Sequence, residues 1–288
     1  MKLALGSAQF GLNYGISNQQ GQVDRQEVLR ILQLAQQQKI TLLDTAAVYG
    51  DSEKILGHSG LCEKFALVSK IPALSAQEKD VAIYIENSLK NLQITQLEAV
   101  LFHRVDDLIS SPLKKVRFDN LIAQKQQGKV KKIGVSVYTP QQLDYCFNHY
   151  PLDIVQLPFN LLDQRFLQTG WLDKLKKSAI EIHCRSLFLQ GLFLMESTQL
   201  ADYFHPYLPV LAKISQKAQT LNTSVLSLAL ALACQQSTID KMIVGCCNKA
   251  QLQEIITAYQ QAKKISANLT DLAYDDEQLL LPSFWPQG

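Results

Sequence analysis

The stretch TLLDTAAVYGDSE (residues 41–53) places polar side chains directly after a short apolar run. Leu42–Asp44 has the length and composition of a buried strand, and Tyr49 follows in the connection after it. Two later segments repeat this pattern, because FALVSKI carries Lys70 near its end and LEAVLFHR carries His103 just past its apolar part. In a barrel of parallel strands, the C-terminal strand ends form the face on which active sites are built.

Short apolar runs alternate with amphipathic stretches along the whole chain. The sequence predicts strands at Leu3–Gly6, Leu42–Asp44, Phe65–Lys70, Ala99–Phe102, Lys132–Val137, Ile154–Leu157, Ile180–Ser186 and Lys241–Val244. Eight such units without a linker predict an α/β protein with a closed (β/α)8 TIM barrel. We expect a single domain over residues 1–288, with 264–288 as a C-terminal loop or tail across one barrel face. An open sheet that bound a dinucleotide would need GxGxxG after its first strand, and the chain has none.

The helices between these strands have recognisable ends. Asp24 and Thr139 are expected N-caps, Pro140 suits a first helical position, and Gly128 suits a C-terminal cap. The predicted helices are Arg25–Gln38, Glu53–Gly57, Val81–Leu92, Leu113–Gln127, residues 140–148, Leu172–Lys177, Pro209–Thr220, Ser224–Cys234 and Asn248–Ala262.

Composition excludes several classes of function. The chain has 288 residues, 47% of them hydrophobic, and a formal net charge of +2 with scattered Lys and Arg, which gives no electrostatic case for nucleic acid. The longest apolar run, Val225–Cys234, is roughly half of what a membrane helix needs, and the N-terminus shows no secretory signal. We therefore expect a cytoplasmic protein that acts on a small molecule without a membrane partner, and the sequence leaves the oligomeric state open.

The six cysteines give no metal site or disulfide framework. They show neither a CxxC pair nor metal-ligand spacing with histidine, so no metal is predicted. We interpret them as small apolar residues in a reducing cytosol, with redox chemistry at the vicinal pair Cys246–Cys247 as the alternative.

Several motifs together point to one family. DTAAVYGDSE, SKI and LFHR are followed in order by KKIGVSVY, VQLPFN, RSLFLQGL and VGCCNKAQLQE. In this order and spacing they resemble the aldo-keto reductases over nearly the whole chain. The resemblance implies NAD(P)H-dependent reduction of an aldehyde or ketone to an alcohol. The opening AQFGLNYGISNQQGQ is similar to bacterial members associated with surface-sugar biosynthesis, which points toward a keto-sugar or sugar derivative as substrate.

The proposed catalytic residues suit that chemistry. Hydride addition to a carbonyl leaves negative charge on oxygen, which a nearby acid must quench. A tyrosine with a pKa near ~10 is a weak acid, and a neighbouring lysine ammonium would lower that value. Lys70 would do this for Tyr49, Asp44 would hold Lys70, and His103 would orient the carbonyl oxygen, which are the roles that the resemblance implies.

The resemblance also implies where cofactor and substrate bind. Ser136 and Gln156 would bind the carboxamide, Phe159 would stack on the nicotinamide, and Gln9, Phe10 and Tyr14 would border the substrate. The remaining cofactor residues implied are Ser186, Leu187, Gly191, Asn248, Lys249, Gln251 and Glu254. NADP(H) is the expected cofactor, and NAD(H) stays open because Cys247 stands where a basic residue is usual, with Lys249 as the replacement cation. Arg185 is left open as a cofactor contact or a structural cation.

Other interpretations are kept beside this one. Taken singly, Tyr49 and Phe159 suit packing, Lys70 suits a surface, and Asp44 and His103 suit satisfied buried positions. A non-catalytic cofactor-sensing protein of the same fold is one alternative function. A lyase or aldolase with Lys70 as a Schiff-base nucleophile is another.

Overall fold

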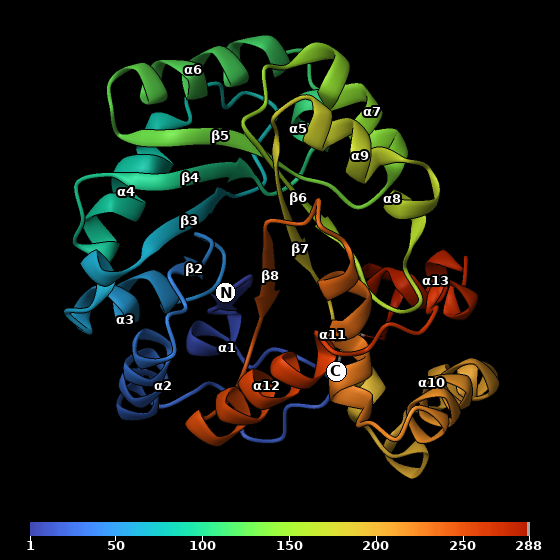
Figure 1. Ribbon diagram of the computed structural model, residues 1–288. Helices are drawn as coiled ribbons and strands as arrows, with labels where there is room; N and C mark the ends of the chain where they lie inside the picture. Colours follow the sequence, from blue (N-terminus) through green and yellow to red (C-terminus); the bar gives the residue numbers. More distant parts are fainter. Residues whose placement is uncertain (287–288) are drawn as a thin grey trace.

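The apolar runs form eight parallel strands that close into a barrel, each strand beside the next one in the chain (Figure 1). The computed structural model describes residues 1–286. Closure comes from β1 against β8, where Leu3 lies opposite Met242. The strands are β1 (Leu3–Gly6), β2 (Leu42–Asp44), β3 (Ala66–Ile71), β4 (Leu97–Phe102), β5 (Val130–Ser136), β6 (Ile154–Pro158), β7 (Glu181–Arg185) and β8 (Lys241–Val244). The predicted (β/α)8 barrel is confirmed.

Helices connect the strands and cover the outside of the barrel (Figure 1). The caps are as expected, because Asp24 accepts a hydrogen bond from Gln26 N–H and Thr139 accepts one from Gln142 N–H, with Pro140 at the helix start. The α-helices are α1 (Ala8–Gly11), α2 (Arg25–Gln37), α3 (Ser52–His58), α4 (Ala82–Leu92), α5 (Asp106–Ile109), α6 (Lys114–Gln126), α7 (Pro140–His149), α8 (Arg165–Gln168), α9 (Trp171–Lys177), α10 (Leu208–Thr220), α11 (Val225–Gln235), α12 (Lys249–Ala262) and α13 (Glu277–Leu280).

The C-terminal tail, expected as a loop over 264–288, contains short helical turns. It forms 3₁₀ turns at Thr270–Leu272 and Pro282–Phe284 on either side of α13. These turns are fixed by burial, since Trp285 is 5% exposed, donates its indole N–H to the Leu279 carbonyl and packs edge-on against Phe204. Residues 287–288 of the expected tail lie outside the described residues.

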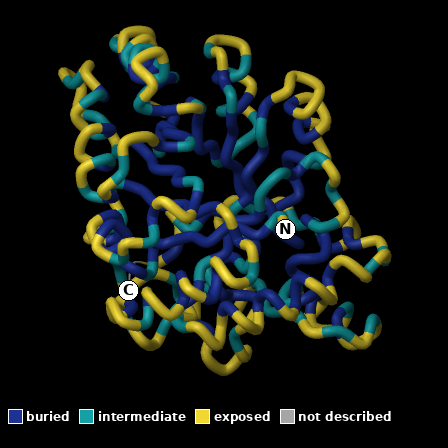
Figure 2. The backbone as a smooth tube through the Cα atoms, turned by 60° about the vertical axis from the view of Figure 1, so that its left-hand side comes forward, coloured by how far each residue is buried: buried dark blue, intermediate teal, exposed yellow. Residues whose placement is uncertain are grey.

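The barrel interior explains how the strands present polar side chains. Its small apolar core consists of Ala4, Leu42, Val68, Ala99, Leu101, Ile154 and Ile243. Successive side chains on a strand point to opposite faces, so a residue two positions after an inward-facing one also points inward. This rule directs Asp44, Lys70, His103 and Gln156 into the barrel at its C-terminal end. The backbone around them is buried, and exposed residues lie on the outer helices and loops (Figure 2).

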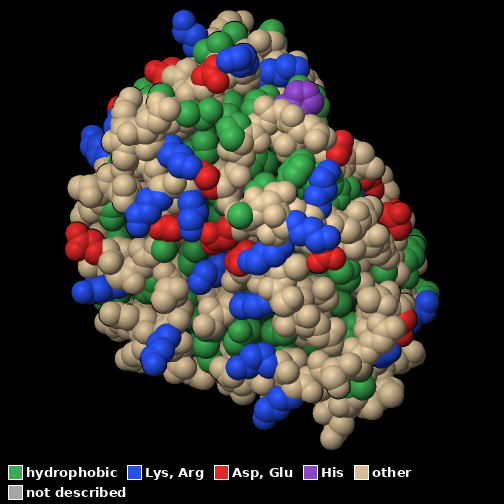
Figure 3. Space-filling model, turned by 45° about the horizontal axis from the view of Figure 1, so that its top comes forward, with side chains coloured by type: hydrophobic (Ala, Val, Ile, Leu, Met, Phe, Trp, Pro, Cys, Tyr) green, Lys and Arg blue, Asp and Glu red, His purple; other side chains and the backbone are tan. Residues whose placement is uncertain are grey.

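Charged side chains are distributed over the surface in ion pairs. Figure 3 shows acidic side chains interspersed with Lys and Arg on one face. At the N-terminal strand ends, Lys132 bridges Glu98 at 2.9 Å and Glu181 at 2.6 Å. These pairs link β5 to its neighbour β4 and, past β6, to β7 at the end of the barrel opposite the cavity. Within residues 1–286, none of the helices has both the length and the apolar character that crossing a bilayer requires.

A glycine substitution should test how tightly the barrel closes. A Cβ added at Gly134 on β5 would lie 1.8 Å from the Ile154 carbonyl oxygen on β6, which is backbone and cannot rotate away. We expect Gly134→Ala to reduce the free energy of unfolding by about 3 kcal/mol or more, at or beyond the upper end of overpacking costs. Gly128→Ala is the control, since its φ of 77° is strained but no atom lies within 4 Å, and it should cost only about 1–2 kcal/mol. Denaturant unfolding measures both, and equal losses would contradict the clash.

Candidate active site

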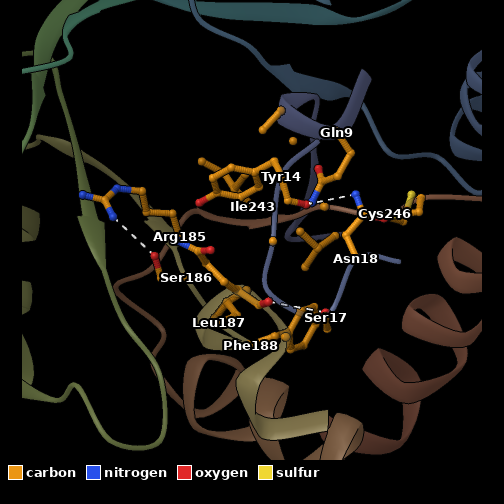
Figure 4. Close-up of a pocket in the computed structure, with 18 of the residues that line it drawn as sticks. Gln9, Tyr14, Ser17, Asn18, Arg185, Ser186, Leu187, Phe188, Ile243 and Cys246 are labelled. Carbon is orange, nitrogen blue, oxygen red and sulfur yellow. Dashed lines mark hydrogen bonds between the residues drawn. The ribbon is translucent and has the colours of Figure 1, made fainter. Parts of the chain in front are cut away.

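A cavity of roughly 640 Å³ opens at the C-terminal ends of the strands (Figure 4). This volume is typical of sites that bind small molecules and cofactors. Its wall is formed by the segment after β1, the ends of several strands, the loop after β7 and the first turns of α12. Of the residues predicted for the site, those that line it are Gln9, Tyr14, Asp44, Tyr49, His103, Gln156, Ser186, Leu187, Gly191, Gln251 and Glu254.

A buried ion pair lies at the base of this cavity. Lys70 Nζ is 2.5 Å from Asp44 Oδ1, and both side chains are at most 4% exposed. Lys70 also donates to the Thr45 carbonyl at 2.9 Å, and Gln156 Nε2 donates to Asp44 Oδ2 at 2.7 Å. Burial lowers the pKa of Lys70. These hydrogen bonds satisfy both carboxylate oxygens and join β2, β3 and β6 inside the barrel.

Two rings lie beside the pair and form part of the cavity wall. Tyr49 and His103 meet edge-on with ring centroids 5.8 Å apart, and Lys70 Nζ is 5.2 Å from the Tyr49 ring centroid. Both rings are half-buried. The structure thus brings together the four residues that the sequence singled out. The Lys70 side chain, only 1% exposed and not part of the cavity wall, is unsuited to the Schiff-base role considered as an alternative.

The pKa of Tyr49 differs from the expectation. We expected Lys70 to lower it, but burial and the nearby Asp44 carboxylate raise it, and Arg185 only partly opposes them. The reason is that Asp44 neutralises Lys70, so little net positive charge is left to stabilise a phenolate. Tyr49 therefore remains a protonated phenol at neutral pH.

His103 is a neutral imidazole in this setting. Burial, with the positive charges of Lys70 and Arg185, lowers its pKa from 6.5 to about 3. A neutral ring keeps one N–H, which can donate a single hydrogen bond into the cavity. The site therefore offers two neutral donors, one phenolic and one from imidazole, to the same region.

The loop after β7 has a strained backbone and a close contact across the cavity. Ser186, Leu189 and Gln190 have φ of 62°, 47° and 55°, values that L-residues rarely adopt. A Cβ on Gly191 would lie 1.9 Å from Ser17 Oγ, so only glycine allows this approach. Strain of this kind persists where the surrounding structure over-determines it, often at ligand-binding segments.

The start of α12 forms the far end of the cavity. Asn248 caps this helix, its side chain accepting a hydrogen bond from Gln251 N–H. Lys249 N–H donates to Glu27 Oε1 at 2.7 Å, while Gln251 and Glu254 face the cavity. The helix terminus therefore already holds a carboxylate from α2.

The other predicted residues lie behind the cavity wall. Phe10 and Phe159, expected to contact substrate and nicotinamide, are both 0% exposed and belong to the apolar core, because their rings pack inward between strands and helices. Ser136 is 1% exposed, and its Oγ has no hydrogen-bond partner in the described structure. A buried hydroxyl without a partner is costly and fits a position that a ligand satisfies.

Sequence reasoning missed other residues of the wall. Tyr138 lies just past β5, and the Arg185 guanidinium stacks on its ring at 4.2 Å. An aromatic residue two positions after Ser136 at a strand end was the available signal. Cys246, interpreted as apolar filler, also lines the cavity, as does Cys247, which stands where the resemblance implies a basic residue. No cluster of His, Cys, Asp or Glu able to hold a metal ion occurs within residues 1–286.

Comparison with known proteins identifies the family. The sequence profile of the Aldo/keto reductase family matches residues 2–269. The chain belongs to the aldo/keto reductase family. Aldo/keto reductases use nicotinamide cofactors for carbonyl reduction, so this chain is an NAD(P)H-dependent oxidoreductase.

Named relatives agree with this family. The chain is 26% identical over 271 residues to the aldo-keto reductase YhdN of Bacillus subtilis, covering 82% of this chain and 79% of that protein. It is 32% identical over 124 residues to the 6-dehydroglucose reductase of Agrobacterium fabrum, covering 36% of this chain and 41% of that protein. The holo form of aldo-keto reductase AKR11C1 from Bacillus halodurans shares the fold, with a TM-score of 0.72, 17% identity and coverage of 94% and 92%.

The lowered pKa of His103 predicts a change in acid stability. Between pH 6.5 and 3 the unfolded chain holds a proton on this residue that the folded chain lacks, so stability falls as pH drops through that window. Replacing His103 with Gln should flatten the fall between pH 7 and 5 by up to about 1.4 kcal/mol per pH unit. Unfolding at each pH measures it. The exposed His58→Gln variant should follow the wild type, and an unchanged slope in His103→Gln would count against a neutral His103.

Proposed function

We propose that this aldo/keto reductase reduces an aldehyde or ketone to an alcohol, with Tyr49 giving the proton. The observation that carries the proposal is that the Tyr49 phenol and the His103 imidazole meet in one cavity wall, with ring centroids 5.8 Å apart, beside the buried Asp44–Lys70 pair. Among residues 1–286, the Tyr49 hydroxyl has no hydrogen-bond partner, so it is available to a substrate oxygen. The His103 N–H fixes the same oxygen from a second direction.

The buried pair supports proton transfer in two ways. Its hydrogen bonds hold Asp44 and Lys70 in fixed positions, so these groups need not reorganise as charge develops. Lys70 Nζ also lies 5.2 Å from the Tyr49 ring centroid, and its charge offsets the Asp44 carboxylate, which alone would oppose any phenolate character that appears as the proton leaves. The raised resting pKa keeps the proton on Tyr49 until a substrate oxygen becomes basic enough to take it.

The residues around the cavity suit a nicotinamide dinucleotide. When bound, the cofactor supplies the hydride. We propose that Ser136 and Gln156 bind its carboxamide, which would satisfy the unpaired Ser136 hydroxyl. Ser186, Leu187 and Gly191 would hold the phosphates through the strained loop after β7, and Gln251 and Glu254 would contact the adenosine end. Because Phe159 is enclosed in the core, we assign no stacking role to it.

The contacts at α12 favour NAD(H) over the NADP(H) expected from the family. A 2′-phosphate at this end would approach the Glu27 carboxylate, which accepts the Lys249 N–H. Of the described residues that line the cavity, Arg185 is the sole Lys or Arg, and it comes from β7 at the other end. We therefore propose that NADH is used at least as well as NADPH.

The substrate is proposed to be a hydroxylated carbonyl compound. Gln9, Tyr14 and Asn18 offer polar groups along the wall (Figure 4). The partial similarity to a 6-dehydroglucose reductase agrees with a keto-sugar or sugar derivative. The six free cysteines are consistent with a cytoplasmic location, which we also propose.

Removing the phenolic hydroxyl tests the proposal. We expect Tyr49→Phe to lower turnover of aldehydes by about 10²–10⁴-fold, the usual scale for an acid–base group, because the variant lacks the hydroxyl that gives the proton. Consumption of NADH or NADPH with a panel of aldehydes and ketones measures this. Cofactor affinity, read from quenching of protein fluorescence, should stay the same, since the ring is retained.

Two results would contradict the mechanism. Full turnover by Tyr49→Phe would mean that the proton comes from elsewhere. Tight cofactor binding by the wild type with no turnover of any carbonyl compound would favour the cofactor-sensing alternative.

A basic residue at position 247 tests the cofactor assignment. Cys247 lines the cavity next to the α12 terminus, so Cys247→Arg would place a guanidinium where a 2′-phosphate would lie. We expect the ratio of kcat/KM for NADPH to that for NADH to rise by about 10- to 100-fold, the equivalent of one charged hydrogen bond of roughly 1.5–3 kcal/mol. Cys247→Ser is the matched control and should leave the ratio unchanged. An unaltered ratio in the arginine variant would place the adenosine end elsewhere.

A further inference from the structure

Arg185 is a cation in the cavity that the reduction mechanism does not use. It is the last residue of β7 and is half-buried, and it lines the same cavity as Tyr49 and His103. Its positive charge acts on both rings. It lowers the pKa of His103 by disfavouring the imidazolium, and it works to lower the pKa of Tyr49 by favouring the phenolate. The guanidinium therefore lies within electrostatic reach of the groups that face the reacting oxygen.

The charge of Arg185 is not compensated by protein. The buried cations Lys70, Arg117 and Arg165 each form an ion pair with an aspartate, at 2.5, 3.6 and 2.8 Å. Arg185 has only neutral partners within residues 1–286, namely the Val137 carbonyl at 3.1 Å and Ser186 Oγ at 3.3 Å. Because Arg185 is half-buried, lines the cavity and has no acidic partner there, its charge is available to an external anion.

The guanidinium is also held in a fixed orientation. It reaches from the end of β7 across to β5, where it bonds the Val137 carbonyl and lies 4.2 Å from the Tyr138 ring centroid. Two of its five N–H groups are used in these contacts, which leaves three for a ligand. A planar, pre-oriented guanidinium is the side chain best suited to binding a carboxylate or phosphate through two parallel hydrogen bonds.

The remaining charges leave the reacting end positive. Asp44 is neutralised by Lys70, and Glu254 lies at the α12 end of the cavity. Figure 4 shows the Arg185 side chain extending away from Ser17, Leu187, Phe188 and Cys246, which lie on the other side of the cavity wall drawn there. The guanidinium bonds the Val137 carbonyl just past β5, and β5 adjoins β4, the strand that His103 follows.

We propose that Arg185 binds an anionic group on the substrate, so that this enzyme prefers carbonyl compounds carrying a carboxylate or phosphate. This inference rests on the proposed carbonyl reduction and adds the charge class of the substrate. The anion would pair with Arg185 while the carbonyl oxygen meets Tyr49 and His103, which fixes the substrate at two points.

Matched substrates test the proposal. 4-Carboxybenzaldehyde carries the anion, and methyl 4-formylbenzoate is its neutral ester with nearly the same shape. We expect the wild type to show a kcat/KM about 10- to 100-fold higher for the carboxylate, the value of one charge-assisted contact. Arg185→Met should bring the two values together, and Arg185→Lys should retain part of the preference. Glyceraldehyde 3-phosphate against glyceraldehyde shows whether a phosphate is bound in the same way.

Each other outcome has a distinct meaning. Equal kcat/KM for acid and ester, and for the phosphorylated and plain aldehydes, would overturn the substrate inference while leaving carbonyl reduction intact. A loss of NADH affinity in Arg185→Met with an unchanged acid-to-ester ratio would also overturn it, because the guanidinium would then serve the cofactor. Failure to reduce any of these carbonyl compounds with either cofactor would contradict the proposed function, and this inference with it.

Discussion

The Asp44–Lys70 ion pair is the interaction on which the rest of the site depends. It joins β2 to β3 inside the barrel, and Gln156 extends it to β6 across the interior. A charge pair removed from water is stable only with good geometry and with its remaining hydrogen-bonding groups satisfied. Both carboxylate oxygens and the lysine have such partners here. The pair therefore gives the end of the barrel a rigid polar base where an apolar core would otherwise continue.

The protonation states above this base follow from it. Burial is the main cause that keeps both Tyr49 and His103 neutral, with the Asp44 carboxylate acting in the same direction on Tyr49 and the Lys70 ammonium on His103. Two neutral donors are well suited to a neutral carbonyl oxygen that becomes negative only during the reaction. The net positive character of this region then comes from Arg185, on the opposite side from the pair.

The cavity itself is built from segments far apart in the chain. The loop after β1 meets the loop after β7 where Gly191 lies against Ser17, and the N-terminus of α12 meets α2 through Glu27. The cavity thus extends from Tyr49 and His103 to the first turns of α12. The chain has no GxGxxG segment after its first strand, and the walls of this cavity come from the loops and strand ends of the barrel.

The sequence by itself determined the barrel and which polar side chains its strands carry to the C-terminal end of the interior. Strand alternation of period two sends Asp44, Lys70, His103 and Gln156 into the barrel, and that is a local property that each segment carries alone. Tertiary structure decided what depends on distant neighbours: the burial of Phe10 and Phe159 in the core, the stacking of Arg185 on Tyr138, and the Glu27 contact with Lys249. The raised pKa of Tyr49 belongs to this second group, because burial and the pairing of Lys70 with Asp44 are set only when the barrel closes.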